Sequence, residues 1–433
     1  MEEPVAEAPA PAGRDLLGSE PGLPGPEKPR RLAEIEAAAA PRCATGVPEL
    51  DRVLGGGLVP GSVVLLAGEP GVGKSTLALQ LAAGLEGAGP ILYVTGEESP
   101  EQLRLRAERL PALPAELLVL AETRVEELAG PWREIRPRAV VIDSVQTLAS
   151  ARVGSAPGSV AQVRECAALL AATAKRQGAS LVLVGHVTKE GTLAGPRVLE
   201  HLVDVVLAFE GERGHPFRML RASKNRFGST GEVGVFHMTG AGLEGVANPS
   251  ELFLAERRAG APGSCIVPLL EGSRPMLVEI QALVAPAGYG TARRTSLGFD
   301  DGRLALLLAV LDRSARVDLL ARDVYVNVAG GVRVSEPGAD LAVALALASS
   351  RLDIPLPADA AACGEVGLGG ELRRVGRIDL RCREAARLGF ARVLLPEGVQ
   401  GGLPGPLRAR ALAFAGLGAA VDWLRARTPV PIP

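Results

Sequence analysis

The sequence is poor in aromatic residues, has no long apolar run and carries almost no net charge. Aromatic residues make up 3% of the 433 positions and hydrophobic residues 47%, so Ala, Leu and Val must build the cores. No apolar run reaches the roughly 18 residues that a membrane-spanning helix needs. The formal net charge of −2 excludes a global attraction to nucleic acid, so a nucleic-acid surface would have to be a local patch.

Cysteine and lysine are both scarce. The five cysteines are odd in number and include no C-x-x-C pair, which argues against a zinc site and against a disulfide framework. We therefore expect reduced, buried thiols and no bound zinc. The N-terminus is acidic and Pro-rich, unlike a secretory signal, so we expect a cytoplasmic protein. The five lysines are Lys28, Lys74, Lys175, Lys189 and Lys224, with none beyond.

Composition divides the chain into three segments. Residues 1–40 are rich in Pro, Ala, Glu and Gly and are predicted to be disordered. Residues 41–250 alternate apolar strands with helices, which is typical of an α/β domain with a mainly parallel sheet covered on both faces. Residues 251–433 follow a shift in composition and are predicted to form a second, α+β domain. The predicted strands cover 62–68, 91–96, 139–144, 180–186, 204–211, 276–284 and 323–331; the helices cover 74–87, 99–110, 158–178, 302–315, 337–352 and 379–389.

Local signals fix two helix starts and one turn. Ser99 and Gln102, with Pro100 between them, form the pattern of a capping box, and Ser159 begins a second S-x-x-Q start. The strand-like segments FRMLRAS and EVGVFHM flank SKNRFGST, residues 223–230. We expect this stretch to be the turn of a hairpin at the sheet edge.

The strongest motif is G-x-x-x-x-G-K-S, which begins at Gly68 after a predicted strand and runs into a predicted helix. Its glycines let backbone N–H groups surround a phosphate, Lys74 reaches the β- and γ-phosphates, and Ser75 ligates Mg²⁺. The motif therefore predicts ATP and Mg²⁺ as cofactors. The predicted nucleotide-binding residues are Gly68, Glu69, Pro70, Gly71, Val72, Gly73, Lys74, Ser75 and Thr76.

Three further acids belong to the predicted site. Asp143 ends the apolar strand AVVID, as the second metal-binding acid of such ATPases does. Glu97 and Glu98 follow another strand at the same carboxyl edge, where ligands bind in parallel sheets. We predict that Glu97 orients the attacking water and that Glu98 supports it. The alternative is that both acids only favour the N-terminus of the next helix.

These motifs, in this order, resemble the RecA-like ATPases. The stretches YVTGEESPEQ, VIDSVQTL, GHVTKEG and SKNRFGSTGEVGVF narrow the resemblance to the bacterial RadA (Sms) family of DNA-repair and recombination ATPases. The resemblance runs from about residue 30 to the C-terminus. It implies a homo-oligomeric ring, six-membered in the family, that acts on single-stranded and branched DNA and works with the RecA recombinase.

The resemblance assigns roles to the KNRFG stretch and to His186. Lys224 and Arg226 are expected to complete the ATP site of a neighbouring subunit, where a cation stabilises the charge that develops on the γ-phosphoryl group. Gly228 is expected to permit the turn and Phe227 to anchor it. A solvated hairpin tip and a DNA contact by this loop remain alternatives. His186 matches a sensor position that couples phosphate state to DNA-binding loops.

Two Gly-rich loops are candidates for gripping a DNA backbone. In related rings the loops at 149–162 and 187–198 face the central channel, and here they carry Arg152, Lys189 and Arg197. Aromatic stacking platforms are absent from both loops, which favours backbone tracking over base reading. Ordinary surface loops are the alternative.

The C-terminal region resembles the Lon protease domain but lacks its dyad. Gly338 stands at the nucleophilic Ser position and Asp379 at the Lys position, so peptide hydrolysis has no route. We expect a scaffold for ring assembly with a duplex-DNA surface. The candidate phosphate contacts are Arg293, Arg294, Arg303, Arg373, Arg374 and Arg377. The family usually opens with a four-cysteine zinc finger, but no cysteine precedes Arg31, so either the start is missing or this member has lost the finger.

The sequence therefore favours a ring ATPase that tracks single-stranded DNA and extends heteroduplex by branch migration. An ATP-dependent protease is disfavoured by the missing dyad. A regulatory, clock-type ATPase acting on protein partners is disfavoured by KNRFG and the Lon-like domain.

Overall fold

The computed structural model describes Leu16 and residues 42–85, 89–110, 117–186, 199–211, 217–288 and 291–427. These residues form two compact units, Met1–Val246 and Ala247–Pro433. The predicted disordered segment 1–40, apart from Leu16, and the candidate DNA loop 187–198 lie outside the described residues. No described helix is long and apolar enough to cross a membrane.

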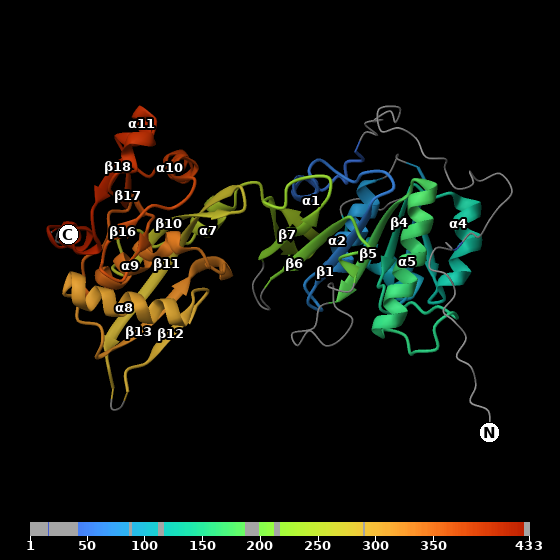
Figure 1. Cartoon of the computed structure of the whole chain (residues 1–433), viewed down its shortest axis with the longest axis horizontal. Coiled ribbons are helices and arrows are strands. Elements are labelled where there is room, and N and C mark those ends of the chain that lie inside the picture. Colours follow the sequence, from blue (N-terminus) through green and yellow to red (C-terminus); the bar gives the residue numbers. More distant parts are fainter. Residues whose placement is uncertain are drawn as a thin grey trace, which may run out of the picture. The chain divides into compact units, whose positions relative to one another are not determined.

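The first unit is an α/β domain whose sheet is mostly parallel (Figure 1). Its elements are α1 (Pro48–Leu54), β1 (Val63–Gly68), α2 (Lys74–Gly84), β2 (Ile91–Thr95), α3 (Pro100–Ala107), β3 (Leu117–Ala121), the 3₁₀ helix η2 (Val125–Leu128), α4 (Ala129–Ile135), β4 (Ala139–Asp143), α5 (Val160–Gln177), β5 (Ser180–His186), β6 (Val205–Glu210), β7 (Phe217–Asn225), β8 (Val233–Thr239) and β9 (Gly242–Gly245).

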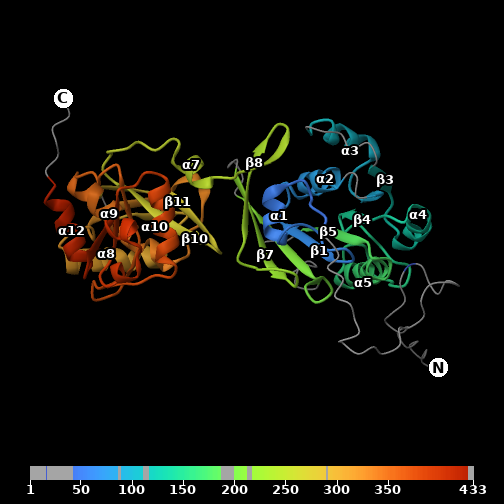
Figure 2. The same ribbon diagram turned by 90° about the horizontal axis from the view of Figure 1, so that it is seen from above.

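The nine strands lie in the order β3-β2-β4-β5-β1-β6-β7-β8-β9. The first six are parallel, and β7, β8 and β9 are added antiparallel, so KNRFG does join a hairpin. One apolar core packs α1, α2 and α3 on one face of the sheet, and a second packs η2, α4 and α5 on the other. Figure 2 shows the two sets of helices on opposite sides of the strands. The predicted parallel sheet with both faces covered is confirmed.

The predicted helix starts differ in how their caps are made. Ser99 and Gln102 form the full capping box of α3. At α5, the Ser159 side chain accepts from the Gln162 backbone, but the Gln162 amide turns away. It donates to the carbonyl oxygens of Ser150 (3.2 Å), Val153 (2.7 Å) and Ser155 (2.9 Å). Gln162 thus holds the loop after β4, and the second start is only half a capping box.

The second unit is α+β and has its own sheet (Figure 1). Its longer elements are α7 (Pro249–Leu254), β10 (Ser264–Glu271), β11 (Arg274–Pro286), β12 (Arg294–Leu297), α8 (Asp301–Ala315), β13 (Arg322–Val328), α9 (Asp340–Leu352), α10 (Ile378–Arg387), β17 (Arg392–Pro396), β18 (Ala411–Phe414) and α12 (Leu417–Arg425). The short ones are η3 (Ala329–Gly331), η4 (Pro337–Ala339), β14 (Ala360–Ala362), β15 (Glu365–Val366), β16 (Leu372–Arg373), η5 (Gln400–Gly402) and α11 (Gly405–Arg408). Seven strands form one sheet in the order β12-β13-β11-β10-β14-β17-β18.

The cysteines carry no bridge in this fold. All five are free thiols, and four of them are buried, with Cys43 partly exposed. Burial raises the pKa of the Cys363 thiol to about 12. The described residues contain no group of three or more His, Cys, Asp or Glu side chains placed to hold a metal ion.

Candidate functional site at the carboxyl edge of the parallel strands

The Gly-rich motif forms a tight loop between β1 and α2. Gly71 and Gly73 have φ values of +81° and +113°, which side chains rarely adopt. A Cβ atom at Gly68 would lie 2.4 Å from the Phe209 carbonyl oxygen, so the backbone passes too close to β6 for any other residue. The loop therefore needs its glycines to direct N–H groups inward at the start of α2.

Lys74 is folded into this loop. Its ammonium group donates to the carbonyl oxygens of Gly68 and Glu69, each at 2.9 Å, and the residue is only 3% exposed. Burial lowers the pKa of the ammonium group, while the charges of Asp143 and Glu97 oppose that shift. A buried cation held by neutral carbonyls is stabilised by an anion in the same loop, which fits a bound phosphate.

Ser75 and Asp143, the predicted metal residues, lie together. The Ser75 hydroxyl donates to Asp143 Oδ1 at 3.1 Å, and the Tyr93 hydroxyl donates to Oδ2 at 2.7 Å. Burial and the adjacent carboxylate raise the pKa of Tyr93 well above its usual value, so the phenol stays a donor. A hydroxyl and a carboxylate are oxygen ligands that Mg²⁺ accepts with waters in its remaining positions. The residues fit a magnesium site. Tyr93 was not predicted, because a Tyr in a buried strand is an ordinary core residue.

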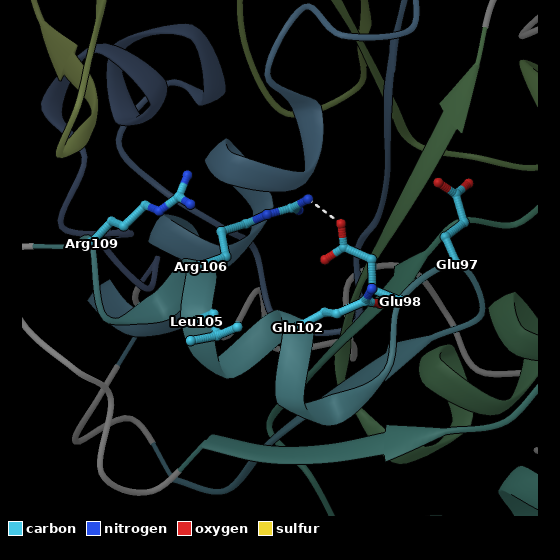
Figure 3. Close-up of a pocket in the computed structure, with 6 residues that line it drawn as sticks. All are labelled: Glu97, Glu98, Gln102, Leu105, Arg106 and Arg109. Atoms are coloured by element: carbon cyan, nitrogen blue, oxygen red, sulfur yellow. Dashed lines mark hydrogen bonds and ion pairs between the residues drawn. The ribbon is translucent and has the colours of Figure 1, made fainter.

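The two consecutive acids after β2 have separate environments. Glu98 forms an ion pair with Arg106 inside a cavity of about 400 Å³. Figure 3 shows the Glu97 carboxylate pointing away from this pair. Of these two acids, Glu98 has an arginine partner and Glu97 has none among the described residues. The cavity is lined by Glu97, Glu98, Gln102, Leu105, Arg106 and Arg109.

Glu97 Oε1 accepts two hydrogen bonds. Ser144 Oγ lies 2.5 Å from it and His186 Nε2 lies 2.9 Å from it. These bonds, His186 first, lower the pKa of Glu97 to about 2, with help from the Lys74 charge and against the effect of burial. The carboxylate is therefore ionised at neutral pH. Ser144 follows β4 and His186 ends β5, so adjacent parallel strands bring both donors to Glu97.

Lys224 and Arg226 lie at the other end of the strands. The Lys224 ammonium group donates to the Glu200 (2.5 Å) and Val203 (2.8 Å) carbonyl oxygens. Arg226 forms a 3.1 Å ion pair with Asp204, whose N–H bonds to Val63 at the start of β1. The Gly-rich loop begins at Gly68, five residues further along β1, or about 16 Å at about 3.3 Å per residue. Neither cation reaches the Gly-rich loop of its own chain.

Two residues that the sequence analysis missed hold the KNRFG loop. The Asn225 amide donates to the Val53 carbonyl oxygen at 3.3 Å and accepts from the Phe227 N–H at 2.9 Å. The Arg42 guanidinium donates to the carbonyl oxygens of Leu54 (2.8 Å) and Phe227 (2.5 Å). These long-range contacts fix the loop against α1 and have no local sequence signal.

The role expected of Phe227 needs correction, whereas Gly228 permits the turn by leaving room and not by its φ value. The Phe227 residue is 36% exposed, so its ring does not anchor the loop in a core. Gly228 does not have a positive φ. A Cβ there would lie 3.1 Å from the Asn225 amide nitrogen, so this glycine makes room for Asn225.

The candidate DNA-binding residues differ in how strongly their side chains bond to other residues of the chain. Arg152, on the loop that Gln162 holds, makes a distant ion pair with Glu165 at 3.7 Å. Lys189 and Arg197 lie outside the described residues.

In the second unit, Arg294 is exposed on β12 next to Arg293. Arg303 differs, because its guanidinium forms two 2.5 Å bonds to the buried carboxylate of Asp340. Arg373 pairs with Glu371 at 2.6 Å and with Glu365 at 3.8 Å.

Gly338, the residue expected at the nucleophile position, lies beside a buried ion pair. Arg381, 3% exposed, bonds to both carboxylate oxygens of Glu336, at 2.7 and 2.6 Å, and to the Pro268 carbonyl oxygen at 2.7 Å. A Cβ at Gly338 would lie 3.4 Å from Arg381 Nη1. Asp379 pairs with Arg383 at 3.6 Å. The ion pair occupies the space next to Gly338.

Fold and site together define a RecA-like P-loop ATPase with a Lon-like second domain. A family model described as an AAA domain matches residues 28–192, and one described as the Lon protease (S16) C-terminal proteolytic domain matches residues 314–404. The AAA match indicates use of a nucleotide, usually with Mg²⁺.

Curated relatives narrow the class to a family. The DNA repair protein RadA of Halalkalibacterium halodurans is 50% identical over 403 residues, covering 93% of this chain and 88% of that protein. RadA of Bacillus subtilis is 53% identical over 372 residues, covering 86% and 81%, and RadA of Streptococcus pneumoniae is 51% identical over 370, covering 86% and 88%. The chain belongs to the RadA family of DNA repair proteins.

Proposed function

We propose that this protein is a DNA-dependent ATPase of recombinational repair. It acts as a ring-shaped, helicase-like motor on single-stranded DNA and extends heteroduplex by branch migration. The observation that carries the proposal is the separation of Lys224 and Arg226 from the Gly-rich loop by about the length of a strand. If the two cations take part in ATP chemistry, they do so in the site of a neighbouring copy. Head-to-tail contacts of that kind form a ring when the rotation between successive copies closes.

In this proposal the backbone N–H groups of residues 68–76, other than Pro70, and the Lys74 ammonium group hold the phosphates of ATP. Ser75 and Asp143 would hold Mg²⁺, which supplies charge neutralisation on the β- and γ-oxygens. Glu97 accepts a hydrogen bond from the attacking water and directs it at the γ-phosphorus. Arg226 and Lys224 of the adjacent copy stabilise the charge that develops on the γ-phosphoryl group.

DNA is proposed to bind along the loops after β4 and β5, through Arg152 on the first and through Lys189 and Arg197 on the second. The second unit adds Arg293 and Arg294 as phosphate contacts. Arg303 is proposed instead to be structural, because Asp340 takes its guanidinium. We further propose a hexamer and the RecA recombinase as partner.

The DNA dependence has a direct test. Single-stranded oligonucleotide should raise the ATP hydrolysis rate about 5-fold or more, a coupling typical of linked sites. Arg152→Ala should weaken that stimulation and reduce its salt dependence, while leaving the rate without DNA unchanged. A rate indifferent to DNA but raised by a protein partner would support the clock-type alternative instead.

The second unit is proposed to be a scaffold without peptidase activity. Gly338 offers no nucleophile and the second unit contains no lysine that could serve as its base. The absence of cleavage of an unfolded protein substrate, with and without ATP, is the expected result. ATP-dependent release of peptides would contradict it.

The Arg381–Glu336 pair predicts a large effect on the stability of this scaffold. Glu336→Gln leaves a buried guanidinium without its carboxylate and should lower the free energy of unfolding of the second unit by about 3 kcal/mol. Urea unfolding of the full chain, followed at Trp423 in a Trp132→Phe background, would measure it. The matched control is Asp379→Asn, which removes an exposed pair on the same helix and should cost less than about 1 kcal/mol. Equal costs would contradict the structural role of the pair.

A further inference from the structure

The Glu97 carboxylate is held at one oxygen only. Ser144 Oγ and His186 Nε2 both donate to Oε1, and within the described residues no hydrogen bond reaches Oε2. Because the carboxylate carries no proton, both partners must donate, which assigns the hydrogen of His186 to Nε2. The other ring nitrogen, Nδ1, is buried without a partner among the described residues.

The two donors belong to a rigid frame. Ser144 is fully buried, and the next residue, Val145, donates its N–H to the Val184 carbonyl oxygen of β5 at 3.0 Å. The Gln146 amide donates to the His186 carbonyl oxygen at 3.4 Å. The ends of β4 and β5 are thus tied together just where each presents its donor.

The same turn also contacts the backbone before Glu97. The Thr147 hydroxyl donates to the Ser144 carbonyl oxygen at 2.7 Å. A Cβ at Gly96 would lie 2.0 Å from Thr147 Oγ1, so only glycine lets β2 approach this turn. The backbone and one oxygen of Glu97 are therefore both fixed by residues 144–147.

We infer that Ser144 is a positioning residue for ATP hydrolysis: with His186 it fixes Glu97 Oε1 and leaves Oε2 as the oxygen that accepts the hydrogen bond of the attacking water. The inference rests on the proposed ATPase function. A carboxylate held by two donors has lost the rotation about its last bonds, so its free oxygen meets the water in one direction. The hydroxyl that fixes Glu97 Oε1 belongs to the residue next to Asp143.

The test is the steady-state kinetics of Ser144→Ala in the full chain with ATP, Mg²⁺ and single-stranded DNA. The expected result is a kcat about 10- to 100-fold lower, because a misdirected carboxylate no longer orients the attacking water. The KM for ATP and the affinity for a fluorescent ATP analogue should stay within about twofold, since uniform binding is untouched. Ser144→Thr keeps the hydroxyl and should restore most of the rate. The matched control is Ser180→Ala, another buried serine, which bonds to the Val59 carbonyl oxygen and should keep the normal kcat.

A second measurement separates this inference from the proposed function. Ser144→Ala should add no further loss in a Glu97→Gln background, measured by single turnover, because both changes remove the same oriented oxygen. If Glu97→Gln keeps the normal rate, the proposed role of Glu97 itself is wrong. Suppose instead that Glu97→Gln lowers the rate. The positioning role alone is then overturned if Ser144→Ala has the normal kcat or loses ATP affinity in parallel with kcat. It is also overturned if Ser144→Ala adds its full loss in the double variant.

Discussion

Lys74→Ala is expected to abolish ATP hydrolysis, with a rate at least about 100-fold lower than that of the unchanged chain. Lys74 is the only cationic residue of the motif at residues 68–76. It also bonds to the carbonyl oxygens of Gly68 and Glu69, so its removal takes away both the charge and two contacts that shape the loop. ATP binding should weaken along with hydrolysis, because the β- and γ-phosphates lose their cation in the ground state and in the transition state.

Phosphate release in the presence of single-stranded DNA, together with binding of a fluorescent ATP analogue, would measure both effects. The matched control is Arg104→Ala, which removes a cation from an exposed pair with Glu108 on α3 and should leave both quantities unchanged. Normal turnover by Lys74→Ala would show that the ATP site lies elsewhere.

Arg226→Ala is expected to separate binding from hydrolysis. ATP should bind normally, because the guanidinium lies about a strand's length from the Gly-rich loop of its own chain. Hydrolysis should fall about 10³-fold, the lower end of what an arginine supplied by a neighbour contributes. Asp204 keeps its bonds to Lys175 and to the Val63 N–H, so the chain should fold. Arg226→Lys keeps the charge but not the planar guanidinium, so its hydrolysis rate should lie between those of the unchanged chain and Arg226→Ala.

The alternatives for this loop make different predictions. If KNRFG contacts DNA only, Arg226→Ala keeps the rate measured without DNA and loses stimulation. If the loop is a solvated hairpin tip, neither rate changes. A fall in the DNA-free rate with normal ATP binding distinguishes the neighbour-site model from both.

Much of the first unit could be predicted because its signals are local. Strands of Val, Leu and Ile, the Gly-rich loop, the Ser99 cap and the strand-end acids each occupy a few consecutive residues, and the structure has these elements where they were expected. β3 was missed; its five residues are mostly exposed, so it lacks the burial of the strands that were predicted. β9 was missed because two of its four residues are glycines.

The second unit was harder to predict from its sequence. β14 consists of three alanines, a composition that favours helix over strand. β10 contains Pro268, which argues against an interior strand. β10 pairs with β14 only through Ile266 and Ala361. Pro268 lies beyond this contact, so its missing N–H does not interrupt the pairing with β14.

Only the parts of the site that lie in local sequence motifs could be predicted. Ser144, Tyr93 and Arg42 act through contacts that join distant parts of the chain. The Arg42 bond to Phe227, for example, spans 185 residues. No spacing pattern in the sequence predicts such a pair, because the fold, and not the local sequence, brings the two residues together.

Subunit mixing tests the central claim, that ATP is cleaved where one copy meets the next. Lys74→Ala and Arg226→Ala chains, each inactive alone, would be combined in equal amounts and assayed for DNA-stimulated ATP hydrolysis. Differently tagged chains would establish that they assemble together. Recovery to about one quarter of the normal rate is expected, because in a head-to-tail ring that fraction of sites pairs an intact Lys74 with an intact neighbouring Arg226. Mixed assemblies that form and remain inactive would contradict it.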